Sequence, residues 1–186
     1  MNKTNKAKSF QAIIKDVEDD NAGNEIGSMI ILDGNAVFHS LTEIPDTFKE
    51  IADKVFDLLP KERDVIFSTD NYKPNSVKAM ERRRRGISDK CLIKSPKMRR
   101  PPDWKKFLTN DENKEMFVKI LLDVWSDDIY SKKLVKRKVI LVVAENAIEL
   151  TSNDGKRVTR REVLDLRSNQ EETDTRVVLY SIYAGL

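Results

Sequence analysis

The chain is poor in the residues that bind soft metals or form disulfide bonds. Its 186 residues include one cysteine, Cys91, and one histidine, His39. A single cysteine excludes an intramolecular disulfide and a thiolate metal cluster, and this usage is typical of a reducing compartment. A Ser-His-Asp triad or a histidine-ligated zinc site would need His39, so the sequence favours neither.

Long apolar runs are missing as well. No segment approaches the ~20 apolar residues that a membrane-spanning helix needs. The basic N-terminus is not followed by the apolar core of a signal peptide. We therefore expect a soluble intracellular protein of the nucleus or cytoplasm, without a membrane partner. The hydrophobic fraction of 39% is sufficient for a folded domain with a core.

Charge is abundant and unevenly distributed. Residues 78–106 include twelve basic and three acidic residues, a net charge of +9, which leaves −6 for the rest of a chain whose total is +3. Such a segment favours a polyanionic partner, DNA or RNA, although a solvated loop without a special role is the alternative. The candidate phosphate-binding residues are Lys78, Arg82, Arg83, Arg84, Arg85, Arg99 and Arg100.

Short apolar runs predict buried strands at residues 28–33, 64–70 and 138–143. Residues 45–59 carry apolar side chains on one helical face, so a helix is expected between the first two strands. This order of strand, helix and strand is the crossover unit of a parallel sheet. The sequence therefore predicts an α/β fold, a Rossmann-like three-layer α/β/α arrangement with a mainly parallel sheet.

The remaining elements follow from helical periodicity and turn residues. Asn153-Asp-Gly155 predicts a β-hairpin that joins residues 147–151 and 156–160. Further helices are expected at 104–108, at 114–125, and from Ser168 to a C-cap at Gly185. In domain terms, we expect an N-terminal helix and linker over 1–28, then one α/β domain over 29–186 with a basic insertion at about 71–106.

Acidic residues follow the first two predicted strands. Asp33 and Asp70 lie at the carboxyl ends of these strands, the edge where open α/β sheets bind their ligands. A third group, Glu171, Glu172 and Asp174, occupies the expected first turn of the last helix. Oxygen ligands without histidine or cysteine favour Mg²⁺ or Mn²⁺. One or two such ions, about 4 Å apart when paired, would suit attack on a phosphodiester.

Each acidic residue also has a structural explanation. Asp33-Gly34 and Asp70-Asn71 are both typical of turns after strands. Ser168-x-x-Glu171 matches a capping box, and Glu172 can pair with Arg176 one helical turn later. Glu172 and Asp174 are then better ligand candidates than Glu171.

Four motifs in order carry a family resemblance. They are Ile31-Leu-Asp33-Gly-Asn-Ala, then Val65-Ile-Phe-Ser-Thr-Asp70, then Lys78…Glu81-Arg-Arg83, and finally Glu171-Glu-Thr-Asp174. This series resembles the PIN-like and flap-endonuclease (structure-specific 5′ nuclease) superfamily. The chain is also similar to a group of uncharacterised, multi-copy animal proteins associated with mobile elements.

The resemblance implies a PIN-like, Mg²⁺- or Mn²⁺-dependent endo- or 5′-nuclease that acts on DNA or RNA. Its catalytic residues would be Asp33, Asp70, Glu172 and Asp174, and Glu171 would join them as a metal ligand. Two features depart from the family pattern. Asn71 stands where a glycine is usual, and the family's last ligands come from a strand after the final helix, which this chain does not include. We therefore expect a PIN-like domain that lacks its last strand.

Two other functions remain open from the sequence. The same scaffold could be a non-catalytic nucleic-acid-binding module that holds its ligand through the basic segment. It could also be a protein-interaction or assembly domain, in which an open sheet edge pairs with a second copy or with a completing C-terminal segment.

Overall fold

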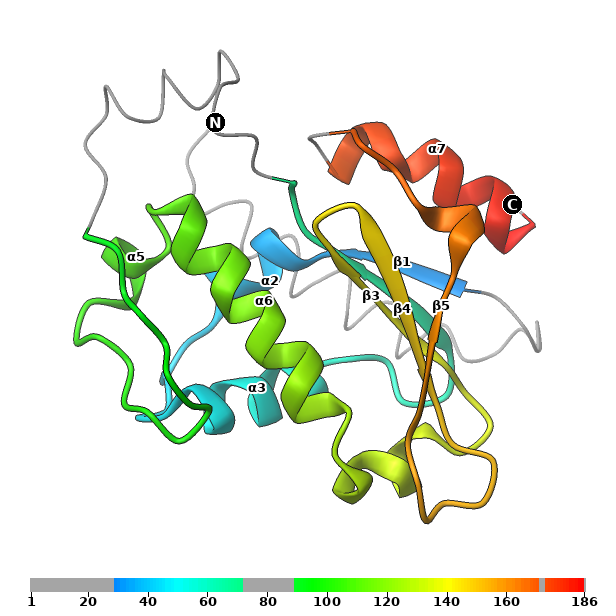
Figure 1. The fold of residues 1–186 in the computed structure, drawn as a ribbon, viewed down its shortest axis with the longest axis horizontal. Helices are drawn as coiled ribbons and strands as arrows, with labels where there is room; N and C mark the ends of the chain where they lie inside the picture. Colours follow the sequence, from blue (N-terminus) through cyan, green and yellow to red (C-terminus); the bar gives the residue numbers. More distant parts are fainter. Residues whose placement is uncertain (1–28, 72–88, 171–172, 186) are drawn as a thin grey trace.

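A computed structural model describes residues 29–71, 89–170 and 173–185, which build an α/β fold around one five-stranded sheet (Figure 1). The strands lie side by side in chain order: β1 (Met29–Asp33), β2 (Asp64–Ser68), β3 (Val139–Val143), β4 (Asn146–Thr151) and β5 (Thr159–Glu162). β1, β2 and β3 run parallel, whereas β4 and β5 pair antiparallel. The predicted α/β class, the parallel strands and the hairpin are confirmed.

The parallel strands form because both of their faces are buried. Val65 and Phe67 of β2 point into one apolar cluster and Ile66 into the other, as expected from the two-residue period of a strand. Leu141 and Ile140 of β3 divide in the same way. A strand covered on both sides reads as a continuous apolar run, which is why these strands could be found in the sequence.

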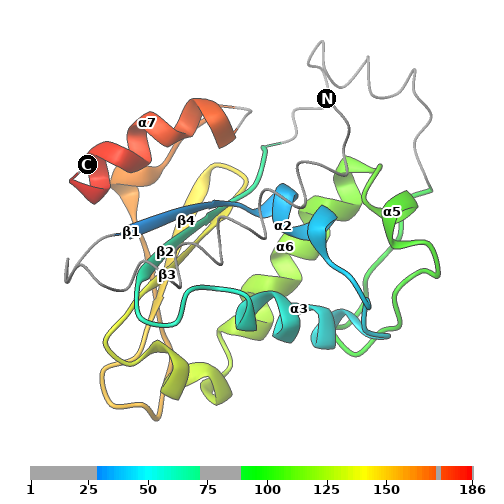
Figure 2. The same ribbon diagram turned by 180° about the vertical axis from the view of Figure 1, so that it is seen from behind.

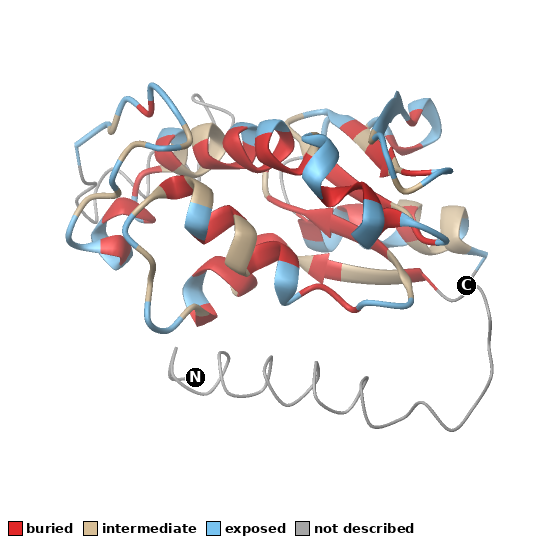
Figure 3. Cartoon of the chain, turned by 90° about the horizontal axis from the view of Figure 1, so that it is seen from below, coloured by how far each residue is buried: buried red, intermediate tan, exposed pale blue. Residues whose placement is uncertain are grey.

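Helices cover the two faces unequally (Figures 1 and 2). The larger core lies between the sheet and α2, α3, α5 and α6, and the smaller core lies under α7. Buried residues are concentrated along the sheet and the inward sides of the helices (Figure 3). The helices are α2 (Gly34–Ser40), α3 (Phe48–Asp57), α5 (Trp104–Phe107), α6 (Asp111–Trp125) and α7 (Thr173–Ala184), with 3-10 turns η1 (Asp128–Leu134) and η2 (Leu164–Leu166).

Capping side chains explain where two of the expected helices begin. α3 begins at Phe48, later than predicted, because the Thr47 hydroxyl accepts the Glu50 N–H while the Glu50 carboxylate accepts the Thr47 N–H. α6 begins at Asp111, earlier than predicted, because Asn110 accepts the Glu112 N–H.

The C-terminal third shows how turns delimit the elements. Gly155 has φ +67°, the left-handed conformation that its hairpin turn requires, and β5 begins only at Thr159. Gly185 has φ +76° after the last turn of α7, as expected for a C-cap. The Ser168 hydroxyl accepts the N–H of Gln170, two residues ahead, and the other half of the expected capping box, Glu171, lies outside the described residues.

Two differences from the prediction bear on the candidate site. α2 was not predicted, and it follows β1 without a loop. β2 ends at Ser68, so Asp70 lies two residues beyond the strand rather than at its end. Within the described ranges, no helix is both long and apolar enough to cross a bilayer.

Candidate functional site

Asp33 ends β1 and caps α2. Its Oδ1 accepts the N–H of Asn35 at 2.9 Å and that of Ala36 at 3.3 Å, so the carboxylate has a fixed orientation at the strand end. Gly34 allows this abrupt change from strand to helix. A Cβ at Gly34 would lie 2.5 Å from Phe67 Cε1 and 2.6 Å from Thr69 Cγ2, so only glycine fits against β2. The turn-like role that Asp-Gly suggested is thus realised as a helix cap.

Asp70 connects the end of β2 to the beginning of α7. Its Oδ1 accepts the N–H of Thr173 at 3.1 Å, across 103 residues of sequence. Two side-chain contacts support this junction: the Ser68 hydroxyl lies 2.9 Å from the Tyr180 hydroxyl and 3.5 Å from Thr173 Oγ1. The first described turn of α7, which carries the exposed Asp174, is therefore held beside the carboxyl ends of β1 and β2.

The electrostatics of Asp33 reflect this arrangement. Burial raises the pKa of its carboxyl group above the ordinary value, and the carboxylates of Asp70 and Asp174 raise it further. The N–H groups of Ala36 and Asn35 lower the pKa and only partly offset these effects. The tertiary structure thus brings Asp70 and Asp174 within electrostatic range of Asp33.

The donor set fits a hard cation in chemical type, because it consists of carboxylate oxygens, and a cation would relieve the repulsion on Asp33. The described residues alone do not complete a site: among them, no group of three or more histidine, cysteine, aspartate or glutamate side chains is placed to hold a metal ion. Two of the five predicted ligands, Glu171 and Glu172, lie outside the described residues.

The predicted phosphate-binding residues divide into three groups. Lys78, Arg82, Arg83, Arg84 and Arg85 lie outside the described residues, whereas Arg99 is exposed. Arg100 has a structural task. Its guanidinium donates four hydrogen bonds to backbone carbonyls, those of Ile44, Pro45, Pro101 and Pro102. Arg100 could contact a phosphate directly only by giving up part of this set, so Arg99 is the better candidate of the two.

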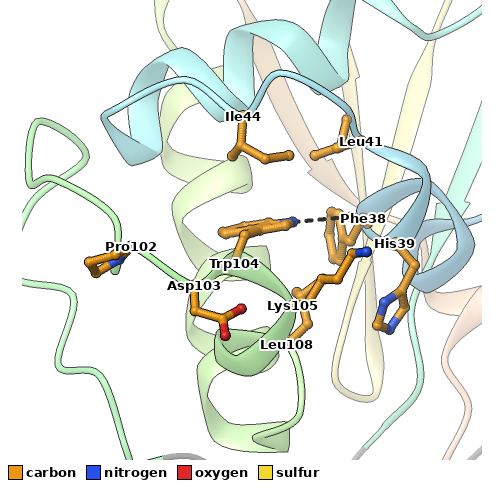
Figure 4. A pocket seen from close by; sticks show the side chains of 9 residues that line it. All are labelled: Phe38, His39, Leu41, Ile44, Pro102, Asp103, Trp104, Lys105 and Leu108. Atoms are coloured by element: carbon orange, nitrogen blue, oxygen red, sulfur yellow. Dashed lines mark hydrogen bonds between the residues drawn. The ribbon is translucent and has the colours of Figure 1, made fainter.

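Sequence reasoning missed a cavity on the far side of α2. It has a volume of about 430 Å³ and is lined by residues 38–44 and 102–108 (Figure 4). Trp104, which lines the cavity, is 5% exposed and stacks on Phe107 with the two ring centroids 5.0 Å apart. The sole histidine, His39, lies at the cavity. No local signal identified the cavity, because its two walls are about sixty residues apart in sequence.

Comparison of the chain with protein-family models, with curated proteins and with solved structures finds no match in any of the three.

Proposed function

We propose that the chain is a divalent-metal-dependent nuclease domain of PIN-like type, which hydrolyses phosphodiesters of DNA or RNA. One observation supports the proposal: Asp33 ends β1 in register with Ser68 of β2, and Asp70 just beyond β2 holds the Thr173 N–H at the beginning of α7, next to Asp174. The electrostatic effect of Asp70 and Asp174 on the pKa of Asp33 agrees with this arrangement. A buried carboxylate with a perturbed pKa at this edge of a parallel sheet is typical of functional sites.

The protein's own residues would orient the ligands. Two N–H groups of α2 hold Oδ1 of Asp33, and the Thr173 N–H holds Oδ1 of Asp70. Asp174 from the first turn of α7 would complete the set, together with Glu171 and Glu172, which precede it in the sequence. Bound Mg²⁺ or Mn²⁺ would supply charge stabilisation and activate water. Arg99, together with Lys78 and Arg82 to Arg85, would hold the phosphate backbone.

The test measures cleavage of end-labelled DNA and RNA oligonucleotides with Mg²⁺ or Mn²⁺. Asp33→Asn keeps the helix cap but removes the charge. We expect at least the roughly 10- to 100-fold loss that follows even outer-shell changes at metal sites. The matched control is Asp127→Asn, since Asp127 also caps a helical element, η1, by accepting the Ile129 N–H. Cutting that survives Asp33→Asn would refute the nuclease assignment.

A second readout does not depend on activity. Mn²⁺ should raise the unfolding temperature of the wild type and of Asp127→Asn, but not that of Asp33→Asn, because a ligand that binds only the native state stabilises it. If neither cleavage nor metal stabilisation occurs, binding that needs no metal and weakens after Arg99→Glu would support the non-catalytic nucleic-acid-binding module instead.

A contrast between the two sheet edges favours a second candidate function, self-assembly. β5 is an edge of four exposed residues, Thr159-Arg-Arg-Glu162, and such charge protects an edge against strand addition. β1 reads Met29-Ile-Ile-Leu-Asp33, and among the described residues it pairs with β2 alone. The helix that packs on β1, α7, exposes Val178 at 66% and Ile182 at 71%.

The occupant that suits this edge is a second copy of the chain, since an apolar strand can pair antiparallel with itself about a two-fold axis. Light scattering would then give twice the chain mass, and Val178→Glu would shift the protein toward monomer. Ile129→Glu is the matched control, because Ile129 is 62% exposed on η1. A wild-type protein that stays monomeric at high concentration would exclude this function.

A further inference from the structure

The cavity beside α2 is an open hollow between two segments. Phe38, Leu41 and Ile44 line it from the end of α2 and the following loop, while Trp104 and Leu108 line it from the other side (Figure 4). Its volume of about 430 Å³ is in the range of small-molecule pockets, roughly 300–1,000 Å³. Leu41 and Ile44 are half-buried and supply its apolar surface together with the 5% exposed Trp104, whereas Phe38 and Leu108 are buried beneath them. This surface suits a weakly polar group rather than an ion.

Hydrogen bonds fix the two walls relative to each other. The guanidinium of Arg100 donates to the carbonyls of Ile44 at 3.1 Å, Pro45 at 2.8 Å and Pro102 at 2.8 Å, which joins the loop after α2 to the segment before α5. The indole N–H of Trp104 donates to the carbonyl of Phe38 at 3.1 Å (Figure 4). The cavity is therefore preformed, which lowers the entropic cost of binding a ligand there.

The polar rim favours an anion. Lys105 is exposed, and its side chain extends across the cavity in the direction of His39 (Figure 4). Within the described ranges, its ammonium group makes no hydrogen bond or ion pair. Asp103, the acidic residue of the rim, uses Oδ1 to accept the N–H of Lys106 at 2.8 Å. The surrounding residues 89–106 include seven basic and two acidic residues, so the local field attracts negative charge.

We propose that this cavity binds a nucleotide, with the base against Leu41, Ile44 and Trp104 and the phosphate at Lys105. The ligand would be either a free mononucleotide or one nucleotide of a bound strand. If the ligand is one nucleotide of a bound strand, the inference rests on the proposed nuclease function. α2 has Asp33 at one end and the cavity at the other, and its seven residues span about 10 Å. At the 3.4 Å spacing of a B-form strand, about three nucleotides would connect the two places.

The test uses the protein labelled with 5-fluorotryptophan, which gives one fluorine resonance for each of the two tryptophans. Trp104 lines the cavity, whereas Trp125 is fully buried against Phe56 and Phe67 and serves as an internal control. Adenosine 5′-monophosphate should shift the Trp104 resonance saturably and leave that of Trp125 in place. Adenosine and ribose 5-phosphate, which each lack one half of the ligand, should bind about tenfold more weakly.

Two neighbouring lysines provide matched variants. Lys105→Glu should weaken the binding of adenosine 5′-monophosphate about tenfold, because it removes a charge-assisted contact to the phosphate. Lys106→Glu makes the same charge change on the same helix but outside the cavity lining, and should change affinity less than twofold. An unchanged Trp125 resonance shows that each variant is folded.

The outcomes separate this inference from the nuclease proposal. If the Trp104 resonance does not respond, or if both lysine variants lose affinity equally, the nucleotide site is refuted, whether or not the protein cleaves a strand. If the resonance responds but no cleavage depends on Asp33, the site stands and the nuclease proposal fails. A trinucleotide that binds more tightly than the mononucleotide identifies a strand as the source, and equal affinity identifies the free nucleotide.

Discussion

Replacing Gly34 by alanine tests how closely the candidate site is packed. Alanine normally stabilises a helical position relative to glycine by about 0.5–1 kcal/mol, since it has less backbone freedom to lose. Gly34 is the first residue of α2 and has no unusual φ, so propensity alone predicts a more stable protein. The tertiary structure predicts the opposite.

The added Cβ would collide with β2. It would lie 2.5 Å from Cε1 and 2.9 Å from Cζ of Phe67, and 2.6 Å from Cγ2 of Thr69, whereas ordinary contact begins at 3.4 Å. The worst overlap is thus 0.9 Å, and Phe67 is fully buried and cannot move aside. Overpacking of this kind costs about 1–3 kcal/mol, which exceeds the gain in propensity. We expect a net loss of about 1–2 kcal/mol in the free energy of unfolding.

Urea denaturation of four proteins decides the question: the wild type, Gly34→Ala, Thr69→Ser and the double variant. Thr69→Ser removes the methyl group nearest to the new Cβ, so the double variant should be more stable than the sum of the single changes by about 0.5 kcal/mol or more. Ala36→Gly, in the same helix, should cost the usual ~1 kcal/mol and confirms that propensity acts there. A Gly34→Ala protein that is more stable than the wild type would refute the packing argument.

Three further predictions concern individual side chains. The raised pKa of Asp33 means that the contribution of this residue to stability falls as pH rises above about 4, because the native carboxyl group holds its proton to higher pH than the unfolded one. Asp33→Asn keeps the cap, so its stability relative to the wild type should increase between about pH 4 and pH 7 in urea titrations. Parallel pH profiles would contradict this. Arg100→Ala should lower the free energy of unfolding by about 1–3 kcal/mol in urea denaturation, because four carbonyl groups lose a hydrogen-bond donor. Arg100→Lys should recover little of this loss, because a lysine lacks the planar fork of the guanidinium. Full recovery by lysine would show that only the charge matters. Tyr130→Phe removes the hydroxyl that donates to the Asp53 carboxylate, and should lower the free energy of unfolding by about 1–3 kcal/mol in thermal denaturation. No loss of stability would mean that Lys49, whose Nζ lies 2.9 Å from Asp53 Oδ2, satisfies that carboxylate alone.

Local patterns made most of the elements predictable. The strand at residues 64–68 and the strand at 139–143 are short runs of apolar, mostly β-branched side chains, and Asn153-Asp-Gly155 specifies the hairpin that follows β4. Errors occurred where a short element has a weak pattern. α2 has seven residues and begins with glycine, so neither its length nor its propensity distinguished it from a loop.

Charge was harder to interpret than hydrophobicity. Arg99 and Arg100 are equivalent in the sequence, as two members of one basic segment. In the structure Arg99 is exposed, whereas Arg100 joins two loops through their carbonyl groups. A run of basic residues gives the local density of charge, but only the positions of acceptors from other segments decide which guanidinium is available to a ligand.

The sequence by itself determined the fold class, the parallel strands, the hairpin and the presence of acidic residues after the first two strands, because each depends on a pattern within a few residues. Only the tertiary structure decided that Asp70 accepts the Thr173 N–H, that Asp174 lies within electrostatic range of Asp33, and that residues 38–44 and 102–108 line one cavity. These features depend on which distant segments pack together. The packing of distant segments is determined by the burial of both sheet faces as a whole, so it cannot be predicted from a short run of residues.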